Sequence, residues 1–287
     1  MTFSQWAPKR KVEENYQVEL SRLIDGFDKK IRRLELISPF DIIDRLQAYC
    51  DTEFFRGFAE ASAYRMVTGL QVGQMQTWKE AARASMQGRV IYQALQNELQ
   101  GSVGIAMRNI VKENARLISS LPSSLRKEAN NFISRESLAG RRAEDIAKDL
   151  KAQFPKVAKA RVLLIARTET SKASTALTRA RSEDLGLAWY IWRTSEDARV
   201  RSAHRHMDKV LVNWNNAPSP EALDHEKSYG HYHAGDTFNC RCYPAPIVNI
   251  NMVRWPAKVY YGGQIRYMTR ARFEQISGAS KRFGFAA

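Results

Sequence analysis

Two kinds of sequence pattern follow one another along the chain and leave few choices of fold. From residue 9 to residue 185, apolar side chains recur at helical spacing, interrupted by isolated proline and glycine residues. An aromatic and β-branched run typical of a buried strand then occupies 188–193. Because helical and strand-forming segments are segregated, the pattern favours an α+β fold. We expect a long, mainly α-helical N-terminal part, a small α+β domain and a basic C-terminal tail.

The expected elements divide the chain into four segments. We predict a helical arm that docks on a partner over 1–135 and linking helices over 136–187. The α+β domain then covers 188–249, and the tail covers 250–287, with a hairpin near residue 262 and a basic helix over 269–276. Helices are expected to start at Lys9, Pro39 and Ser102. Further helix boundaries are expected at residues that usually interrupt helices, which are Gly69, Gly73, Pro122, Gly140 and Pro155.

Three polar residues follow the first expected strand at helical spacing. Thr194 or Ser195 can cap a helix that begins after the strand. In such a helix Asp197, Arg201 and His204 occupy positions i, i+4 and i+7 and share one face. This face is either a solvated surface with one Asp–Arg pair or a polar triad turned toward the cysteines.

Residues that bind metals are concentrated in one stretch. All five histidines and two of the three cysteines lie between His204 and Cys242. A strand over 239–248, paired beside 188–193, would place Cys240 and Cys242 on one face. With His204 and either His231 or His233, the cysteines would form a Cys2His2 set suited to a structural zinc, which is the one candidate cofactor. Alternatively, both cysteines are buried and pack as small apolar residues.

Three motifs together resemble one known family. They are W-x-T-x-x-D-x-R-V-R-x-x-H from Trp192, N-C-R-C-x-P-x-P from Asn239, and A-R-T-E from Ala166. Over roughly 138–248 the chain resembles the phage Mu F-like minor head proteins, the phage head morphogenesis family of tailed bacteriophages. The chain departs from the family after the histidine, where it lacks a turn with glycine. The motif residues are Arg167, Glu169, Trp192, Asp197, Arg201, His204, Cys240, Arg241 and Cys242.

The resemblance implies a minor protein of the virion head that is made in the host cytoplasm. Such a protein would lie in the head interior or near the portal, and would bind the portal protein and a major capsid or scaffold protein. In some systems family members contact viral double-stranded DNA or leave the head with it. The resemblance implies no enzyme activity, and we assign no catalytic residue.

The alternative function is a metal-dependent nuclease or hydrolase carried in the virion. It would use the concentrated residues His204, His231 and His233 together with the cysteines. The sequence argues against it, because it shows no paired carboxylates spaced for two metals and no nucleophile–base–acid set. A host DNA-binding module is a third class, but no recognition motif for DNA bases is present.

The formal net charge of +15 predicts attraction to a polyanion. The excess is concentrated in 156–182 and 250–287, each with seven Lys or Arg residues against one Glu. We therefore expect contacts with DNA phosphates that do not depend on base sequence, although a basic surface can also serve solubility alone. The expected contact residues are Lys156, Lys159, Arg161, Lys172, Arg179, Arg266, Arg270, Arg272, Lys281 and Arg282.

Two further expectations concern the partner of Glu169 and the absence of a membrane span. Glu169 borders a helix face of small residues and should have a cationic partner, for which Arg201 and Arg241 are the candidates. No apolar run approaches the roughly 18 residues of a membrane span. The N-terminal residues 1–16 also lack the apolar core of a signal peptide, so we expect no membrane span.

Overall fold

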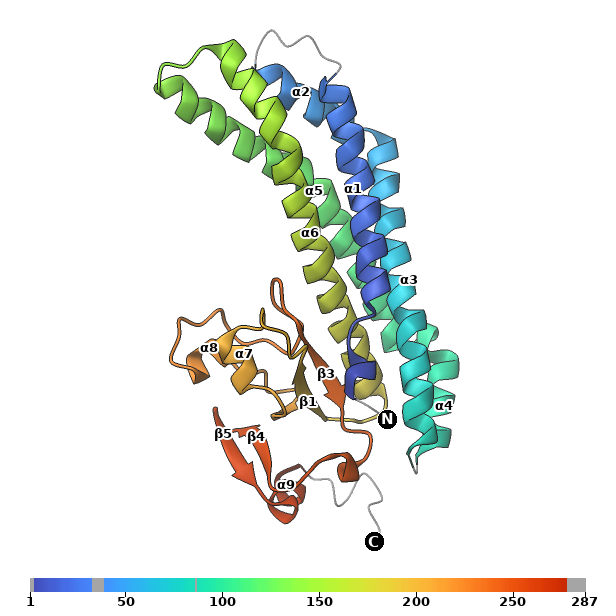
Figure 1. Ribbon diagram of the computed structural model, residues 1–287. Helices are drawn as coiled ribbons and strands as arrows, with labels where there is room; N and C mark the ends of the chain where they lie inside the picture. The colour runs from blue at the N-terminus through green and yellow to red at the C-terminus, as the bar shows by residue number, and fades with distance from the viewer. Residues whose placement is uncertain (1–2, 33–38, 86, 278–287) are drawn as a thin grey trace. The chain divides into compact units, whose positions relative to one another are not determined.

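The computed structural model describes residues 3–32, 39–85 and 87–277, and the chain forms two compact units (Figure 1). We call them the sheet unit, which comprises Met1–Pro8, Gln71–Ile105 and Ser174–Ala287, and the helical unit, which comprises Lys9–Leu70 and Ala106–Ala173. Each unit is discontinuous in sequence because three helices contribute residues to both. The expected segment boundaries after residues 135, 187 and 249 therefore fall inside the units and not between them.

Five helices contribute to the helical unit: α1 (Arg10–Arg32), α2 (Pro39–Cys50), α3 (Glu53–Arg83), α5 (Ser102–Leu138) and α6 (Ala143–Asp184). Its buried side chains come from all of these helices and include Leu20, Ile42, Phe55, Ile118 and Ala158. Buried Tyr16 donates a hydrogen bond to Asn114 at 3.2 Å and so links α1 to α5. None of the helices among the described residues is both long and apolar enough to cross a membrane.

The expected helix starts at Pro39 and Ser102 are present, but four of the other expected helix boundaries are wrong. Gly69 and Gly73 lie inside α3, Pro122 inside α5 and Pro155 inside α6, whereas Gly140 does follow the end of α5, with φ of +75°. Glycine inside a helix costs only about 1 kcal/mol and proline about 3 kcal/mol. Buried apolar residues on both sides of Pro155, such as Phe154 and Ala158, offset that cost through packing.

Two breaks in the helical part were not expected. Thr52 separates α2 from α3, and its hydroxyl accepts a hydrogen bond from the Phe55 amide at 3.3 Å, as an N-cap does. Gly88 begins α4 (Gly88–Asn97), where a side-chain Cβ would lie 2.3 Å from the carbonyl oxygen of Ala82. The chain can turn this closely after α3 because residue 88 has no side chain.

The sheet unit contains one mixed five-stranded sheet in the order β3-β1-β2-β4-β5. Its strands are β1 (Trp189–Thr194), β2 (Leu211–Asn213), β3 (Cys242–Pro246), β4 (Ala257–Tyr261) and β5 (Gln264–Met268). The expected pairing of the first strand with the cysteine strand is confirmed, since β1 and β3 are antiparallel with Thr194 opposite Cys242. The α+β class is thereby confirmed, with a long helical part before a small sheet.

The segment expected to be a separate tail takes part in this sheet. The predicted hairpin is present as β4 and β5, and β4 pairs in parallel with β2 through Leu211 and Val259. The basic helix is also present as α9 (Arg270–Ser277), whose Phe273 is buried against Trp189. Residues 257–277 are therefore part of the sheet unit, because their apolar side chains complete its core.

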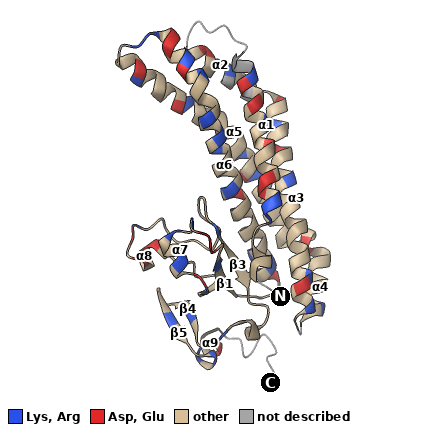
Figure 2. Ribbon diagram, viewed as in Figure 1, with Lys and Arg blue, Asp and Glu red and all other residues tan. Residues whose placement is uncertain are grey.

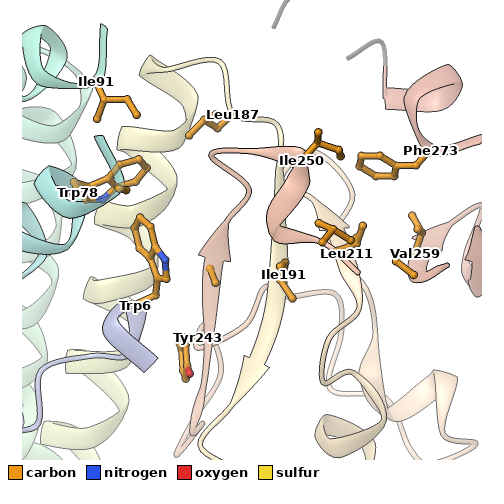
Figure 3. Close-up of a cluster of buried hydrophobic side chains, with 14 of the residues drawn as sticks. Trp6, Trp78, Ile91, Leu187, Ile191, Leu211, Tyr243, Ile250, Val259 and Phe273 are labelled. Carbon is orange, nitrogen blue, oxygen red and sulfur yellow. The ribbon is translucent and has the colours of Figure 1, made fainter. Parts of the chain in front are cut away.

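Apolar side chains cover both faces of the sheet, as the alternation along β1 shows. Ile191 joins a cluster that also contains Trp6, Trp78, Val259 and Phe273 (Figure 3). In this cluster the rings of Trp6 and Trp78 pack edge to face with centroids 4.9 Å apart. The neighbouring residues Tyr190 and Trp192 point to the other face of the sheet. There they belong to a second apolar cluster, which also contains Tyr232, Cys240 and Cys242.

A buried ion pair crosslinks the helices of the sheet unit. Arg181 on α6 donates two hydrogen bonds to Glu98, at 2.7 and 2.9 Å, and the two side chains are 2% and 3% exposed. Gln71 donates to Glu98 at 2.7 Å, and Gln74 accepts from Arg181 at 2.5 Å. Because both charges are fully hydrogen-bonded, the pair is tolerated in the interior.

Replacing Arg181 should therefore destabilise the sheet unit strongly. Arg181→Met leaves the Glu98 carboxylate buried without its cation, and we expect a loss of about 3–5 kcal/mol. All six tryptophans lie in the sheet unit, so tryptophan fluorescence during denaturant unfolding reports on this unit. The matched control is Arg179→Met, which removes an exposed pair with Glu183 and should cost less than about 1 kcal/mol. Equal effects of the two substitutions would contradict the role of the buried pair.

Candidate functional site

The segment after β1 does not form the expected helix. Glu196 adopts a left-handed conformation with φ of +57°, and the Asp197 carboxylate accepts a hydrogen bond from the Arg199 amide at 2.9 Å. Such side-chain-to-backbone bonding favours a turn over a helix. The helix α7 (Ser202–His206) begins only after Arg201, so the prediction that Asp197, Arg201 and His204 share a helix face is wrong.

The cysteine segment also differs from expectation. The strand β3 begins at Cys242 and not at residue 239, because Asn239 has φ of +50° and turns the chain. Cys240 thus precedes the strand, and its sulfur lies 3.4 Å from the amide of Cys242. Strand alternation therefore does not explain why the two thiols lie together; the tight turn before β3 does.

Both thiols contact His204, as the sequence predicted. The Nδ1 atom of His204 lies 3.3 Å from the Cys242 sulfur and 3.6 Å from the Cys240 sulfur. The three side chains are buried, with exposures of 2% for His204, 4% for Cys240 and 1% for Cys242. The ring of Trp192 packs edge-on against the imidazole at 5.8 Å between centroids. The short helix α7 and the start of β3 thus bring these donors to one point.

Two residues that the sequence did not indicate complete the site on the other side of the imidazole. The Nε2 atom of His204 lies 2.9 Å from the Tyr232 hydroxyl and 3.4 Å from the Glu221 carboxylate. Tyr232 in turn donates a short hydrogen bond to Glu221, which lies on α8 (Pro220–Leu223) and is 1% exposed. We call Glu221, Tyr232, His204, Cys240 and Cys242 the His204 cluster.

The hydrogen bonds define where the protons lie in the His204 cluster. The Tyr232 hydroxyl has one hydrogen, which it donates to Glu221, so its oxygen accepts from Nε2–H of His204. This assignment leaves the lone pair of Nδ1 directed at the two sulfur atoms. The imidazole is thus held in one tautomer by the buried hydroxyl and carboxylate.

The two thiols differ in acidity. Hydrogen bonding from the Cys242 thiol holds the pKa of Cys240 well below its usual value despite burial. Burial raises the pKa of Cys242 well above its usual value, and its contact with Cys240 raises the pKa further. Burial and the bond to Glu221 likewise raise the pKa of Tyr232. The contact between the two sulfur atoms therefore shifts their pKa values in opposite directions.

Other expected site residues lie outside the His204 cluster. Arg241 pairs with Asp197 at 3.1 Å, and Arg201 donates to the Phe238 carbonyl at 2.9 Å with its guanidinium 4.3 Å from the Phe238 ring centre. These contacts link the segment 197–201, which precedes α7, to the segment 238–241, which precedes β3. The Arg201 and Asp197 side chains therefore support the fold around His204. Among the described residues, neither is hydrogen-bonded to the imidazole.

Neither of the two histidines proposed as a fourth ligand joins the thiols. His233 lies 3.1 Å from the Tyr190 hydroxyl and packs against Trp214, and burial lowers its pKa to about 4, so it is neutral near pH 7. His231 is exposed and lies 3.0 Å from the Ala217 carbonyl. Among the described residues, the group able to hold a metal is His204, Cys240 and Cys242, whose donor atoms lie within 4.8 Å of one another.

The A-R-T-E element lies in α6, within the helical unit. Its Arg167 pairs with Glu13 of α1 at 3.3 Å, and its Glu169 lies 3.9 Å from the ammonium of Lys172. Glu169 thus has a cationic neighbour on its own helix. The expected pairing of Glu169 with Arg201 or Arg241 stays a prediction, because those arginines belong to the other unit.

Many of the expected DNA-contacting side chains are paired with acids. Figure 2 shows Lys and Arg interspersed with Asp and Glu along the helices. The pairs formed by these residues are Lys159–Asp25, Arg161–Glu128, Lys172–Glu169, Arg179–Glu183 and Arg270–Glu274. Lys156 and Arg266 are exposed, and Arg272 bonds to Gln275, whereas Lys281 and Arg282 lie outside the described residues. The local charge available to DNA is therefore smaller than the sequence count.

A cavity of about 470 Å³ in the sheet unit is lined by cationic side chains that no sequence motif connects. Its lining includes Lys209, Arg254 and Lys258, together with Tyr267, which is 72% exposed. The acid Asp208 also lines the cavity and lies 3.6 Å from Arg193. Within the part of the chain that the structure describes, no ion pair with an acid is recorded for these three cations. Arg193 also lines the cavity, but it is paired with Glu196 at 2.6 Å. No sequence spacing connects these residues, since β2 and β4 bring them together.

Comparison with known proteins agrees with the motif resemblance. Residues 130–244 match the family model described as "Phage Mu protein F like protein". This segment contains every residue of the His204 cluster, and the match supports the resemblance to that family that the sequence motifs predicted.

A protein of Haemophilus influenzae, described as uncharacterized, is 32% identical to the chain over 138 residues. The match covers 48% of this chain but only 28% of that protein. No solved structure matches the chain.

Removing the Tyr232 hydroxyl should weaken the site. In Tyr232→Phe the buried Glu221 carboxylate and the Nε2–H of His204 both lose a partner, which should lower the free energy of unfolding by about 1–3 kcal/mol. Tryptophan fluorescence in denaturant measures the change. Tyr229→Phe is the control, because Tyr229 is 58% exposed and its ring contacts remain. A Tyr232→Phe protein as stable as the control would contradict this hydrogen-bond assignment.

Proposed function

We propose that the protein is a minor head protein of a tailed bacteriophage, which acts in head morphogenesis near the portal and contacts the packaged DNA. The observation that carries this proposal is the family match over residues 130–244. The matched segment includes β1, the first residues of β3 and the His204 cluster, so it corresponds to folded structure and not to a short motif alone. Portal location and DNA contact go beyond the family match and need their own tests.

The burial of the His204 cluster supports a structural role over catalysis. His204, Glu221 and Cys242 are 2%, 1% and 1% exposed, so a macromolecular substrate cannot reach them without unfolding of the site. A nuclease would need an accessible metal or base beside the scissile phosphate. We therefore propose that the cluster fixes the shape of the sheet unit, and we retain a virion-carried metal-dependent nuclease or hydrolase as the alternative function.

The helical unit is the proposed docking module for the portal or a neighbouring capsid protein. Phe54 and Tyr64 on α3 are 69% and 60% exposed, although large aromatic side chains usually contribute to buried surfaces. Aromatic residues are also enriched where proteins bind one another. These two side chains are therefore the best-defined anchors for a partner within this unit.

Substitution of these anchors should reduce incorporation into heads. We expect Phe54→Ser with Tyr64→Ser to leave the denaturant midpoint nearly unchanged but to lower the amount of protein in purified heads severalfold. Substitutions are preferable to deletion of residues 1–135, because Trp6 and Trp78 of that segment are part of the sheet-unit core. Tyr92→Ser in α4 of the sheet unit is the control. Normal incorporation of the double variant would place docking elsewhere.

The cationic cavity supports the proposed contact with DNA. Lys209, Arg254 and Lys258 surround a concave surface beside Tyr267, so phosphate oxygens could approach several cations at once. Ion pairs reduce the charge of the predicted helical block 156–182, whereas none is recorded for these cations within the described residues. We therefore assign the main phosphate contact to the cavity.

DNA binding should be strongly salt-dependent and indifferent to base sequence. Each lost phosphate contact lowers the slope of log K against log salt by about one, so Arg254→Ala with Lys258→Ala should lower it by about two. Lys159→Ala with Arg161→Ala is the control and should change it less, because both side chains are paired with acids. Binding can be measured by fluorescence anisotropy on duplexes of different sequence.

Two outcomes would contradict this assignment. Absence of binding at low salt, or strong discrimination between duplex sequences, would remove the electrostatic explanation. The same incubations with Mg²⁺, Mn²⁺ or Zn²⁺ test the alternative function, and we expect plasmid, single-stranded DNA and RNA to stay intact. Cleavage that disappears in a His204→Ala variant would favour the nuclease.

A further inference from the structure

The three buried donors of the His204 cluster have the spacing of a metal site. The Nδ1 atom of His204 lies 3.3 and 3.6 Å from the sulfur atoms of Cys242 and Cys240, and all three donor atoms lie within 4.8 Å. A tetrahedral zinc ion with bonds of about 2.3 Å to sulfur and about 2.0–2.1 Å to nitrogen holds these atoms about 3.5 Å apart. Small shifts of the side chains would therefore suffice to place one ion between them.

Hydrogen bonding alone does not satisfy this group of atoms. Nδ1 has one lone pair and accepts one good hydrogen bond, yet two sulfur atoms contact it. A divalent cation placed between the three atoms would be bound by all of them, since cysteine sulfur and the lone pair of a neutral imidazole are both metal ligands.

The surroundings of the imidazole also match those of a metal ligand. Metal-binding histidines usually donate their second ring N–H to a carboxylate, directly or through a neighbouring group, which fixes the ring and its tautomer. Here Nε2–H meets the Tyr232 hydroxyl, which donates to the Glu221 carboxylate. Glu221 and Tyr232 therefore direct the Nδ1 lone pair toward the thiols, and this explains why a carboxylate lies buried at 1% exposure beside a histidine.

We propose that Cys240, Cys242 and His204 bind one zinc ion within the sheet unit, with Tyr232 and Glu221 as the hydrogen-bonded support of His204. Two thiolates and one imidazole suit zinc better than calcium or magnesium, which prefer oxygen ligands. The side chains supply three of the four positions of a tetrahedral ion. Although catalytic zinc sites also have three protein ligands, burial of these donors keeps a substrate away from the ion, so its role is to join α7 to the turn before β3.

This proposal is independent of the head-protein function and is tested on the full-length protein. Metal analysis after purification without chelators should give about one zinc per chain, and Co²⁺ replacing it should give sulfur-to-cobalt charge-transfer absorption. Cys242→Ser and His204→Ala should lose the zinc and the cobalt absorption. His233→Gln is the matched control, since His233 is also buried but lies outside the donor group, and it should retain both.

A second measurement keeps the proposal testable if the ligand variants do not fold. Glu221→Gln preserves all three donors and should bind zinc about 10–100-fold more weakly, because the support of His204 is altered. In the unaltered protein, zinc should also protect Cys240 and Cys242 from alkylation, as peptide mass mapping would show. A folded protein that neither contains zinc nor binds added zinc or cobalt would overturn the proposal. Zinc retained at full stoichiometry in Cys242→Ser and His204→Ala would overturn it as well.

Discussion

The contacts of a single imidazole ring connect the segments on which the family motif lies. His204 reaches the two thiols through Nδ1 and the Tyr232–Glu221 pair through Nε2, and each partner comes from a different turn, helix or strand end. Because the ring and its partners are buried, each unmade contact would leave a polar group without water. The geometry of β1, α7, α8 and β3 therefore depends on His204 having partners on both sides, the Tyr232 hydroxyl at Nε2 and the two thiols, with the proposed zinc, at Nδ1.

Charged side chains have different partners in the interior and on the surface of the protein. In the interior of the sheet unit, Arg181 and Glu98 form a bidentate pair that two glutamines complete. On the helices, many Lys and Arg residues are paired with neighbouring acids, so the formal charge of +15 overstates the field of those faces. The proposed DNA contact thus rests on the local arrangement of Lys209, Arg254 and Lys258, and not on net charge alone.

Patterns in the sequence predicted those helices and strands that depend mainly on the residues of their own segment. The aromatic run of β1, its pairing with the cysteine strand, the Gly262-Gly263 hairpin and the basic helix α9 were all expected and are present. The helix expected after Thr194 is absent because Glu196 adopts a left-handed conformation and Asp197 bonds to the backbone. Pro155 was expected to end a helix, but the packing of Phe154 and Ala158 maintains α6. Glu221 and Tyr232 could not be found by spacing, since only the tertiary fold brings them to His204.

We propose that the chain is a structural component of the phage head in which the motif residues His204, Cys240 and Cys242 form part of the interior. Cryo-electron microscopy of intact virions at side-chain resolution is the most direct test. We expect density for the helical and sheet units at the portal vertex or inner shell, with His204, Cys240 and Cys242 in contact inside the sheet unit. Virions that contain no copy of the chain, or a copy in which these three side chains lie apart and face the DNA, would contradict it.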